Sequence, residues 1–390
     1  MARLVYIATH PVTAFRLLDG QLRFMREAGY DVTVITAPGA LLERAAEREG
    51  VRALAVPMRR EMSLGADAVS LARLTRVLHQ LKPDIVNAGT PKGGLLGVLA
   101  ARASRVPIVI YHLRGLRFEG AQGAPRLVLA ASEHVAAGAS HRVFVNSQSL
   151  LERFVALGCA PREKAWVPHL GSSNGIDFER FALAGADRAA VGKLRQQWGI
   201  AEDAFVIGFV GRFTRDKGIA QLVAAFRAAA DKDGRLRLLL VGDHDDTDPL
   251  PQDVRRAITS DPRITVTGFV DEPATLYPTM DVFAFTSLRE GFPNAPLEAA
   301  AARLPVIAFR AIGTVDVVVS GETGLLLSFG DEAALARAFL DYAADPARVA
   351  REGGAGHARA RDKFRREVVW RAIHEEYQRL LSSLDARRHR

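Results

Sequence analysis

Short apolar runs recur along the first half of this chain, with segments of helical spacing between them. The runs are rich in β-branched residues and cover residues 4–8, 31–36, 84–87, 107–111 and 142–146. Uninterrupted runs of this kind are typical of parallel strands that are buried on both faces of a sheet. Between two of them, leucines at positions 71, 74, 78 and 81 have helical spacing, and Lys82-Pro83 is expected to end that helix. The alternation predicts a doubly wound α/β domain, in which ligands bind at the carboxyl ends of the strands.

A second series of the same kind follows a loop-forming segment. Residues 168–177 are small, polar and rich in glycine, and we interpret them as an interdomain hinge. The strands expected beyond the hinge cover residues 204–210, 236–241, 264–267, 282–285, 305–308 and 325–327. Apolar residues with helical spacing near the end of the chain predict a last helix that packs on another element; they are Val369, Ile373, Tyr377, Leu380 and Leu384, with Trp370 beside them. We expect an N-terminal domain of residues 1–170 and a C-terminal domain of residues 171–366.

Composition places the chain among globular proteins. It has 390 residues, of which 48% are apolar, so it can bury large cores and is expected to be soluble. No apolar run reaches the roughly 20 residues of a membrane span, and the run 4–8 is too short for a signal peptide. Cys159 is the only cysteine, which excludes an intramolecular disulfide and agrees with a reducing cytoplasm. We interpret this cysteine as structural.

The net charge of +8 is confined to the first part of the chain. Residues 1–170 contain 22 Lys and Arg against 13 Asp and Glu, whereas the remainder contains 30 against 31. A basic half beside a neutral half indicates an anionic partner for the basic half, such as a phospholipid surface, a phosphorylated acceptor or nucleic acid. The alternative is that these arginines lie on solvated helix faces and bind no partner.

The most informative motif is residues 290–298, Glu-Gly-Phe-Pro-Asn-Ala-Pro-Leu-Glu, which follows an expected strand. Asn294 with Pro296 has the cap and proline pattern that opens a helix. Glu290 then lies on the loop and Glu298 one turn inside the helix. Because the free amides of a first helical turn favour a phosphate, a nucleotide-sugar donor suits the two carboxylates. The alternative is two glutamates that flank a helix start by chance.

Cations follow another expected strand. Residues 211–218, Gly-Arg-Phe-Thr-Arg-Asp-Lys-Gly, come after the run 204–210. At the carboxyl end of a strand, these cations can neutralise a diphosphate leaving group. The segment lacks the Gly-Lys-Ser/Thr of a Walker loop, and no Gly-x-Gly-x-x-Gly follows the strands. Both absences argue against nucleoside-triphosphate and dinucleotide chemistry.

Three loops after strands of the first half contain further candidates. The first is residues 9–13, Thr-His-Pro-Val-Thr. The second is residues 90–94, Thr-Pro-Lys-Gly-Gly, which combine a lysine, glycines and a helix start and can bind phosphate without full P-loop spacing. The third is residues 112–117, His-Leu-Arg-Gly-Leu-Arg, which can clamp an acceptor through the histidine and two arginines. The alternative for the third loop is a set of exposed basic side chains.

The chain resembles the retaining nucleotide-sugar glycosyltransferases of the GT-B fold, family 4, over nearly its whole length. The resemblance rests on Gly211-Arg212 with Lys217-Gly218, on the Glu290 and Glu298 pair, on residues 321–326 (Gly-Glu-Thr-Gly-Leu-Leu) and on the two α/β halves. Residues 90–94, 114–117 and 172–175 look like the branch that builds O-antigen, capsule and exopolysaccharide repeat units on a lipid carrier. The resemblance implies two Rossmann-like domains facing across a cleft, with a C-terminal helix, about residues 367–385, that crosses back to the first domain.

The resemblance also implies that the C-terminal domain binds the nucleotide sugar, with UDP as the expected nucleotide. Arg212 and Lys217 would hold the diphosphate and Glu290 the transferred sugar, which makes these three the expected catalytic residues. Glu298 would bind the ribose, the segment 268–270 the base, and amides of Ala295 and Leu297 the phosphates. The wider donor site comprises Gly211, Gly268, Phe269, Val270, Gly291, Phe292, Pro293, Asn294, Ala295 and Leu297.

By the same resemblance the N-terminal domain binds the acceptor, a lipid-linked saccharide. The residues implied are Thr90, Lys92, Gly93, Gly94, His112, Arg114 and Arg117. We expect Arg59 and Arg60 to face an anionic membrane surface, so that the protein is cytoplasmic and peripheral at the inner face of the plasma membrane. Nucleic acid is not an expected partner, because the few aromatic residues show no stacking pattern.

Two departures from the family pattern affect these expectations. Many members have glycines in the loop after the first strand, where this chain has Thr9-His10-Pro11. Many also have a histidine at the position of Arg114, whereas the histidine of this chain is displaced to His112. Close approach of the first loop to the donor, and the usual role of the histidine, therefore do not carry over directly.

The expected mechanism uses no cofactor and no metal. In a retaining transfer on this fold the acceptor attacks the front face of the sugar, and cations with helix amides stabilise the departing diphosphate. Residues 243–246, Asp-His-Asp-Asp, suggest an Asp-x-Asp metal motif, but we interpret them as an acidic surface loop after a strand. Two other functions stay open from the sequence: a sugar-nucleotide isomerase or epimerase on a related fold, and a noncatalytic basic protein that binds membrane or nucleic acid.

Overall fold

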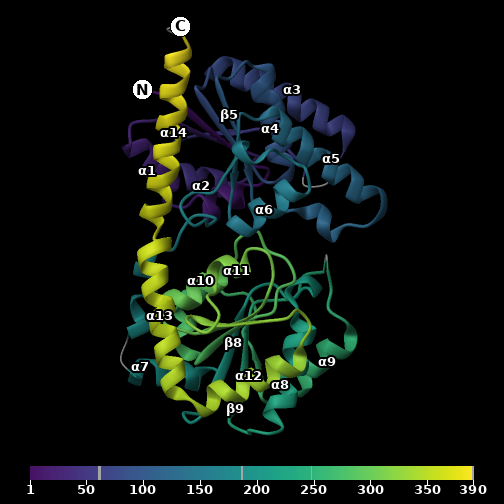
Figure 1. The fold of residues 1–390 in the computed structure, drawn as a ribbon, viewed down its shortest axis with the longest axis vertical. Helices are drawn as coiled ribbons and strands as arrows, with labels where there is room; N and C mark the ends of the chain where they lie inside the picture. The colour runs from purple at the N-terminus through teal and green to yellow at the C-terminus, as the bar shows by residue number, and fades with distance from the viewer. Residues whose placement is uncertain (60–62, 186–187, 247, 389–390) are drawn as a thin grey trace. The chain divides into compact units, whose positions relative to one another are not determined.

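The computed structural model describes residues 1–59, 63–185, 188–246 and 248–388 (Figure 1). The chain divides into two compact units: Met1–Gly175 with Arg366–Arg390, and Ile176–Arg365. The division after Gly175 falls within the expected hinge, slightly beyond the expected domain end at residue 170. The chain returns to the first unit at Arg366, where the last helix begins.

A seven-stranded sheet forms the centre of the first unit, and all of its neighbouring strands are parallel. Its order is β3-β2-β1-β4-β5-β6-β7. The strands are β1 (Arg3–Ile7), β2 (Asp31–Thr36), β3 (Arg52–Ala55), β4 (Ile85–Gly89), β5 (Ile108–Leu113), β6 (Arg142–Val145) and β7 (Ala165–Trp166). The direction of the strand order reverses between β1 and β4, which is where doubly wound sheets bind ligands.

The two edge strands of this sheet were not predicted from the sequence. β3 has no fully buried residue, and β7 has only two residues. β3 has an arginine and two alanines among its four residues and is exposed at both ends, and β7 is too short to form a run, so neither has the apolar run that marks the predicted strands. The five central strands coincide with the expected runs to within two residues at each end.

Helices cover both faces of this sheet. They are α1 (Gln21–Glu27), α2 (Ala40–Glu49), α3 (Leu64–Leu81), α4 (Pro91–Ala103), α5 (Gly123–Ala139), α6 (Gln148–Ala156) and α14 (Arg366–Arg388), with a π-helical turn at Thr13–Leu17. The end of α3 is as predicted, because Lys82 takes a left-handed conformation (φ 47°) directly before Pro83. Leu74 and Leu78 of α3 are fully buried.

The last helix packs on the first unit through its predicted apolar face. Val369, Ile373 and Tyr377 of α14 are buried in one core with residues of β1 and α1. The Tyr377 ring stacks on Phe144, with 5.8 Å between the centroids, and its hydroxyl accepts a hydrogen bond of 2.6 Å from Asn87 Nδ2. These contacts join α14 to β4 and β6.

The second unit contains a six-stranded parallel sheet in the order β10-β9-β8-β11-β12-β13. Its strands are β8 (Phe205–Val210), β9 (Leu236–Val241), β10 (Ile264–Val266), β11 (Val282–Phe285), β12 (Val306–Phe309) and β13 (Gly324–Leu327). Its α-helices are α7 (Arg188–Gln197), α8 (Ile219–Ala230), α9 (Gln252–Ser260), α10 (Asn294–Ala301), α11 (Thr314–Val317), α12 (Glu332–Ala344) and α13 (Pro346–Phe364). All six strands were predicted, and the strand order reverses between β8 and β11.

Two apolar cores explain why these strands are continuous apolar runs. Along β11, Val282 and Ala284 belong to the core on one face of the sheet, whereas Phe283 and Phe285 belong to the core on the other. Successive side chains of a strand point to opposite faces, so burial of both faces leaves no polar position. Within the described ranges, the structure contains no helix that is both long and apolar enough to cross a membrane.

Candidate active site

The reversal point of the second sheet brings the two donor motifs together. The loop after β8 contains Lys217, the loop after β11 contains Glu290, and Lys217 Nζ lies 2.5 Å from Glu290 Oε1. Ser287 Oγ donates to the same carboxylate oxygen at 2.8 Å. Both ionic side chains are largely shielded from solvent, with 19% and 16% exposed. A cation and a carboxylate that are 73 residues apart in the sequence thus form one site.

Backbone contacts hold the two loops against each other. Thr286 Oγ1 donates to the carbonyl of Lys217 at 2.9 Å, and the amide of Leu288 donates to the carbonyl of Asp216 at 2.8 Å. Gly218 has a φ of 68°, and a Cβ at this position would lie 2.1 Å from the carbonyl oxygen of Thr286. Only glycine therefore permits this approach.

Arg212 is held by the acidic segment that follows β9. Its Nη1 donates to Asp245 Oδ2, while 58% of the Arg212 side chain stays exposed. The segment is fixed in turn, because the amide of Phe213 donates to the carbonyl of Asp243 at 2.8 Å. The interpretation of residues 243–246 as an acidic surface loop is thus incomplete, since Asp245 orients a candidate catalytic cation.

Helix α10 begins one residue earlier than predicted. Pro293 is its N-cap (φ −79°, ψ 127°), no side chain caps the helix, and Asn294 is its first residue. The prediction of Asn294 as the capping residue was therefore wrong. In a helix that begins at Asn294, the amide of Leu297 donates to the carbonyl of Pro293. The first-turn amides left for a phosphate are then those of Asn294 and Ala295.

Some side chains around α10 belong to the apolar core, and others belong to the candidate site. Phe292 and Leu297 are buried, and the Phe292 ring lies 5.5 Å from that of Phe364, so these residues can contact a ligand only through their backbone. Glu298 Oε2 accepts a hydrogen bond of 2.8 Å from the hydroxyl of Tyr277. Burial and the neighbouring Glu298 raise the pKa of Tyr277, which keeps this phenol protonated as a donor.

Three glycines lie side by side at the carboxyl ends of β8, β9 and β10. The amide of Gly211 donates to the carbonyl of Val241 at 2.9 Å, and the amide of Gly242 donates to the carbonyl of Gly268 at 3.1 Å. A Cβ on Gly242 would lie 1.9 Å from the carbonyl oxygen of Gly211. The predicted base segment 268–270 is thus tied to the loop after β8 through β9. Its Phe269 is 65% exposed.

At the reversal point of the first sheet, the hydroxyls of two threonines are hydrogen-bonded to each other. Thr9 Oγ1 and Thr90 Oγ1 are 2.8 Å apart, and the amide of Gly93 donates to Thr9 Oγ1 at 2.8 Å. The amide of Gly94 donates to the carbonyl of Thr90 at 2.7 Å. Both glycine amides therefore already have acceptors within the protein, and a Cβ on Gly93 would lie 2.7 Å from the amide nitrogen of Thr9.

Lys92 also has a partner within the first unit. Its Nζ lies 2.8 Å from Asp67 Oδ1 of α3, and only 9% of its side chain is exposed. A phosphate can reach this lysine only by sharing it with, or displacing it from, the carboxylate. Asp67 could not be identified from the sequence, because it lies 25 residues before Lys92 in a helix with no motif.

His112 lies within a strand and not in the loop where it was expected. It is 3% exposed in β5, and its Nε2 lies 2.9 Å from Asn146 Oδ1. Burial and the nearby Arg114 lower its pKa to about 3, so the imidazole is neutral. His112 can therefore position its neighbours as an uncharged group, but it cannot act as a cationic clamp near neutral pH.

Arg114, directly after β5, is a cation with few hydrogen-bond acceptors around it. Its Nη1 donates to the carbonyl of Ser173 at 3.3 Å, and no group in the described residues accepts from its buried Nε. Burial lowers its pKa to about 10. A buried guanidinium without a carboxylate partner favours an anionic ligand. Arg117, three residues further, is exposed.

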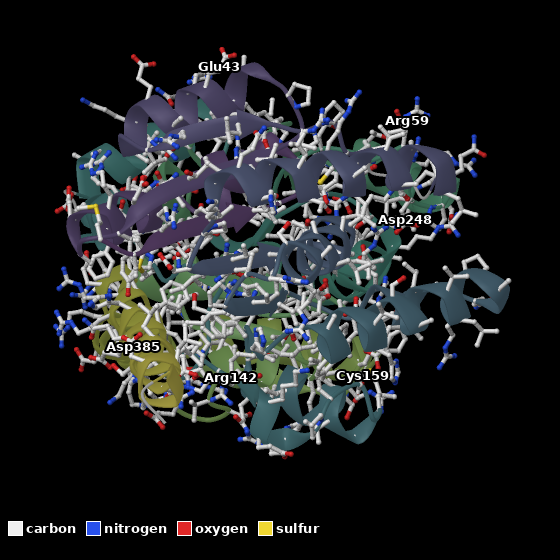
Figure 2. All side chains as sticks on the ribbon, turned by 90° about the horizontal axis from the view of Figure 1, so that it is seen from above. Glu43, Arg59, Arg142, Cys159, Asp248 and Asp385 are labelled. Atoms are coloured by element: carbon white, nitrogen blue, oxygen red, sulfur yellow. The ribbon has the colours of Figure 1, made fainter. Side chains whose placement is uncertain are left out.

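Of the two arginines expected to face the membrane, the structure describes one. Arg59 is exposed and its side chain points outward (Figure 2), whereas Arg60 lies outside the described residues.

Cys159, labelled in Figure 2, is buried, and burial with the nearby Glu133 raises the pKa of its thiol to about 11. A protonated, buried thiol agrees with the structural interpretation.

Sequence reasoning missed several residues that complete the site. Ser287 and Asp245 hold Glu290 and Arg212, and Tyr277 holds Glu298. The available signals were weak: Ser287 precedes the glutamate motif by three residues, and Asp245 lies four residues after the end of an expected strand. Tyr277 lies in a short 3-10 turn with no motif. In the described part of the chain, no three His, Cys, Asp or Glu side chains are placed to hold a metal ion.

Comparison with known proteins identifies relatives along both units. Residues 204–345 match the family model described as "Glycosyl transferases group 1", and residues 18–171 match the one described as "Glycosyl transferase 4-like domain". The "Capsular polysaccharide biosynthesis glycosyltransferase CapM" of Staphylococcus aureus is 33% identical over 372 residues, covering 95% of this chain and 96% of the relative. A "GDP-mannose-dependent alpha-mannosyltransferase" of Mycobacterium tuberculosis is 32% identical over 80% of this chain and 78% of its own.

A further relative is named with its donor and acceptor. The "UDP-Gal:alpha-D-GlcNAc-diphosphoundecaprenol alpha-1,3-galactosyltransferase" of Escherichia coli is 29% identical over 73% of this chain and 72% of its own length. Among solved structures, Anabaena HepE in complex with UDP-glucose has the same fold, with a TM-score of 0.80 at 23% identity over 97% of this chain and all of that one. The fold is therefore GT-B, with two Rossmann-like parallel-sheet domains.

Proposed function

This chain belongs to the group 1 glycosyltransferases of family 4, and we propose that it transfers a sugar, with retention, from a UDP-linked donor to a lipid-linked saccharide. The observation that carries the proposal is the pairing of Lys217 with Glu290 where the strand order of the second sheet reverses. In this proposal Lys217 binds the diphosphate, and the carboxylate beside it accepts from sugar hydroxyls.

The residues on this site support a front-face transfer. The acceptor oxygen bonds to the anomeric carbon as the bond from that carbon to the diphosphate oxygen breaks on the same face. The acceptor proton passes to the departing diphosphate. Lys217, Arg212 and the outward amides of α10 stabilise the charge on the leaving group. Glu290 orients the transferred sugar, and Glu298, fixed by Tyr277, accepts from the ribose.

The choice of UDP and of a lipid-linked acceptor is supported by named relatives. The E. coli relative uses UDP-galactose and a diphosphoundecaprenol-linked sugar by its name, and the S. aureus relative is named for capsular polysaccharide biosynthesis. GDP is the competing nucleotide, because the M. tuberculosis relative is named for GDP-mannose. We place this enzyme accordingly in surface polysaccharide assembly at the cytoplasmic face of the membrane.

Arg114 is the acceptor-site residue that the geometry favours. Its guanidinium is the group with an unfilled donor, whereas Lys92 is paired with Asp67 and the Gly93 and Gly94 amides are already used. The acceptor pyrophosphate supplies the anion that Arg114 lacks. Lys92 contributes after release from Asp67.

Transfer from radiolabelled donors to a lipid-linked acceptor in detergent tests this function. The wild-type protein is expected to move label from a UDP-sugar into the lipid fraction, and the anomeric configuration of the product to match that of the donor. Competition by unlabelled UDP, but not by GDP, supports the nucleotide assignment. Label that is released as a free, altered sugar without entering the lipid, or transfer that gives the opposite anomer, contradicts the proposal.

A further inference from the structure

A further cation, Arg289, lies in the loop after β11, directly before Glu290. Its Nη2 lies 3.7 Å from Asp216 Oδ2, a distance that makes an ion pair but is too long for a hydrogen bond. Asp216 is the one described carboxylate within ion-pair distance of this guanidinium. No group in the described residues accepts from the buried Nε of Arg289. The side chain of Arg289 therefore acts on Asp216 through its charge and not through a hydrogen bond.

The carboxylate of Asp216 belongs to the turn that presents Lys217. The hydroxyl of Thr214 donates to Asp216 Oδ1 at 2.5 Å, and Thr214 is the N-cap of the 3-10 turn Arg215–Lys217. Asp216 is thus useful to the shape of this turn. Its charge is unfavourable, however, because it lies directly before the lysine that is proposed to bind a diphosphate. An anionic ligand at Lys217 needs this carboxylate to be compensated.

Two ion pairs of opposite direction join the loops after β8 and β11. Lys217 and Glu290 pair a cation of the first loop with a carboxylate of the second, whereas Asp216 and Arg289 pair a carboxylate of the first with a cation of the second. These four side chains together are neutral. Without Arg289 they would be one cation and two carboxylates, so a diphosphate would enter a negative site.

The loops do not need the Arg289 side chain to stay together. The amide of Leu288 donates to the carbonyl of Asp216 at 2.8 Å, and the hydroxyl of Thr286 donates to the carbonyl of Lys217 at 2.9 Å. Both contacts end on main-chain carbonyls, so they are independent of the charge on Asp216 and Arg289. What the guanidinium adds to this arrangement is its positive charge.

From these contacts we propose that Arg289 is a positioning residue of the donor site, which compensates the charge of Asp216 and so leaves Lys217 available to the donor diphosphate. Arg289 acts through Asp216 and does not itself bind the donor. If the guanidinium is removed, the carboxylate both attracts Lys217 and repels the diphosphate, which weakens nucleotide binding. The inference rests on the proposed function for the identity of the ligand, but nucleotide binding tests it without an acceptor.

Isothermal titration of the full-length protein with nucleotide is the test. UDP and GDP are both titrated, because they share the diphosphate, and the tighter-binding one is used for the variants. Arg289→Ala should weaken binding roughly tenfold. Asp216→Asn removes the opposing charge and keeps an acceptor for the Thr214 hydroxyl, so it should bind within about threefold of wild type. Arg289→Ala with Asp216→Asn, and Arg289→Lys alone, should also bind within about threefold of wild type, because neither leaves the carboxylate uncompensated.

Arg235→Ala is the matched control. It breaks an ion pair of 2.7 Å with Asp233 before the amino end of β9, far in the sheet from the donor loops, and should bind nucleotide like the wild type. Arg289→Gln replaces the alanine variant if that variant does not fold by circular dichroism.

Three results overturn the proposal. One is wild-type nucleotide affinity in a folded variant that lacks the Arg289 cation. Another is an equal loss for Arg289→Ala, Asp216→Asn and their combination, which assigns the pair to holding the turn. The third is a loss for Arg289→Ala that Asp216→Asn does not relieve, which means that the arginine binds the donor itself.

Transfer rates separate this inference from the proposed function. Arg289→Ala should raise the donor KM roughly tenfold and leave the acceptor KM unchanged, and adding Asp216→Asn should restore the donor KM. Wild-type protein that binds the nucleotide but transfers no sugar to the lipid-linked acceptor contradicts the proposed function and leaves the role of Arg289 in place. Normal transfer by the wild type, with unchanged nucleotide binding by Arg289→Ala, contradicts the role of Arg289 alone. A wild type that binds neither nucleotide contradicts both.

Discussion

At the scale of single residues, the proposed donor chemistry depends on the contact between Lys217 and Glu290. Removing a cation from a developing diphosphate charge costs roughly 2 to 4 kcal/mol, so Lys217→Ala or Arg212→Ala should lower kcat on the order of 10²-fold. Glu290→Gln should impair transfer and leave UDP affinity nearly unchanged, whereas Glu298→Gln should weaken UDP itself. Arg215→Ala removes an exposed cation of the same loop and is the matched control. Turnover of Lys217→Ala within about threefold of wild type contradicts the assignment.

A second residue, Glu133, gives the first unit a pH-dependent stability. Burial raises its pKa from 4.5 to about 7, so the folded protein holds a proton that the unfolded chain releases between these values. This contribution to stability is complete below pH 4.5 and is lost as the pH rises through 7. Glu133→Gln keeps an acceptor for Tyr111, and urea denaturation should show it gaining up to about 3 kcal/mol over wild type at pH 8 relative to pH 4.5. A constant difference across this range contradicts the shift.

At the scale of elements, we expect strand ends and the start of α10 to take the place of a metal at the diphosphate. Arg212 and Lys217 follow β8, and the amides of Asn294 and Ala295 begin α10, so cations and hydrogen-bond donors are available for a diphosphate. EDTA should leave the initial rate essentially unchanged. A rate abolished by EDTA and restored by Mn²⁺ would instead assign the acidic segment 243–246 to a metal.

The last helix depends on polar contacts within an aromatic core. The Tyr377 hydroxyl accepts from Asn87 Nδ2 at 2.6 Å and lies 3.2 Å from the Tyr6 hydroxyl. Tyr377→Phe leaves the buried Asn87 amide short of an acceptor and should lower the free energy of unfolding by about 1 to 3 kcal/mol. Ser383→Ala removes an exposed hydroxyl of the same helix and should have little effect. Chemical denaturation compares the two, and equal stabilities contradict the assigned role of the tyrosine.

At the scale of the whole molecule, the two units should act on different substrates. Arg114→Ala should raise the acceptor KM with the donor KM unchanged, and Lys92→Ala should do so less strongly because Asp67 already binds that lysine. Substitutions in the second unit, such as Glu298→Gln, should have the opposite pattern. Initial rates with each substrate varied in turn measure both constants. A change confined to the donor KM for Arg114→Ala would move the acceptor site to another surface.

The sequence by itself determined the fold class, eleven of the thirteen described strands and most of the candidate site residues. Strands buried on both faces, such as β11, must be apolar at every position, and the left-handed Lys82 before Pro83 ends α3 through local sterics alone. Glu290 and Glu298 were recognisable because their motif spans nine consecutive residues. Each of these signals is local, so it can be read without knowing which segments meet.

Only the tertiary structure decided which side chains pair. The edge strands β3 and β7 were recognised only from their pairing with β2 and β6, because β3 is partly exposed and β7 has only two residues. Asp67 holds Lys92, Asp245 holds Arg212, and Thr9 uses the amide of Gly93. Strand order brings these groups together, and parallel sheets join strands that are distant in the chain. Lys217 meets Glu290 for the same reason: β8 pairs with β11, so two loops about 70 residues apart end at one edge of the sheet.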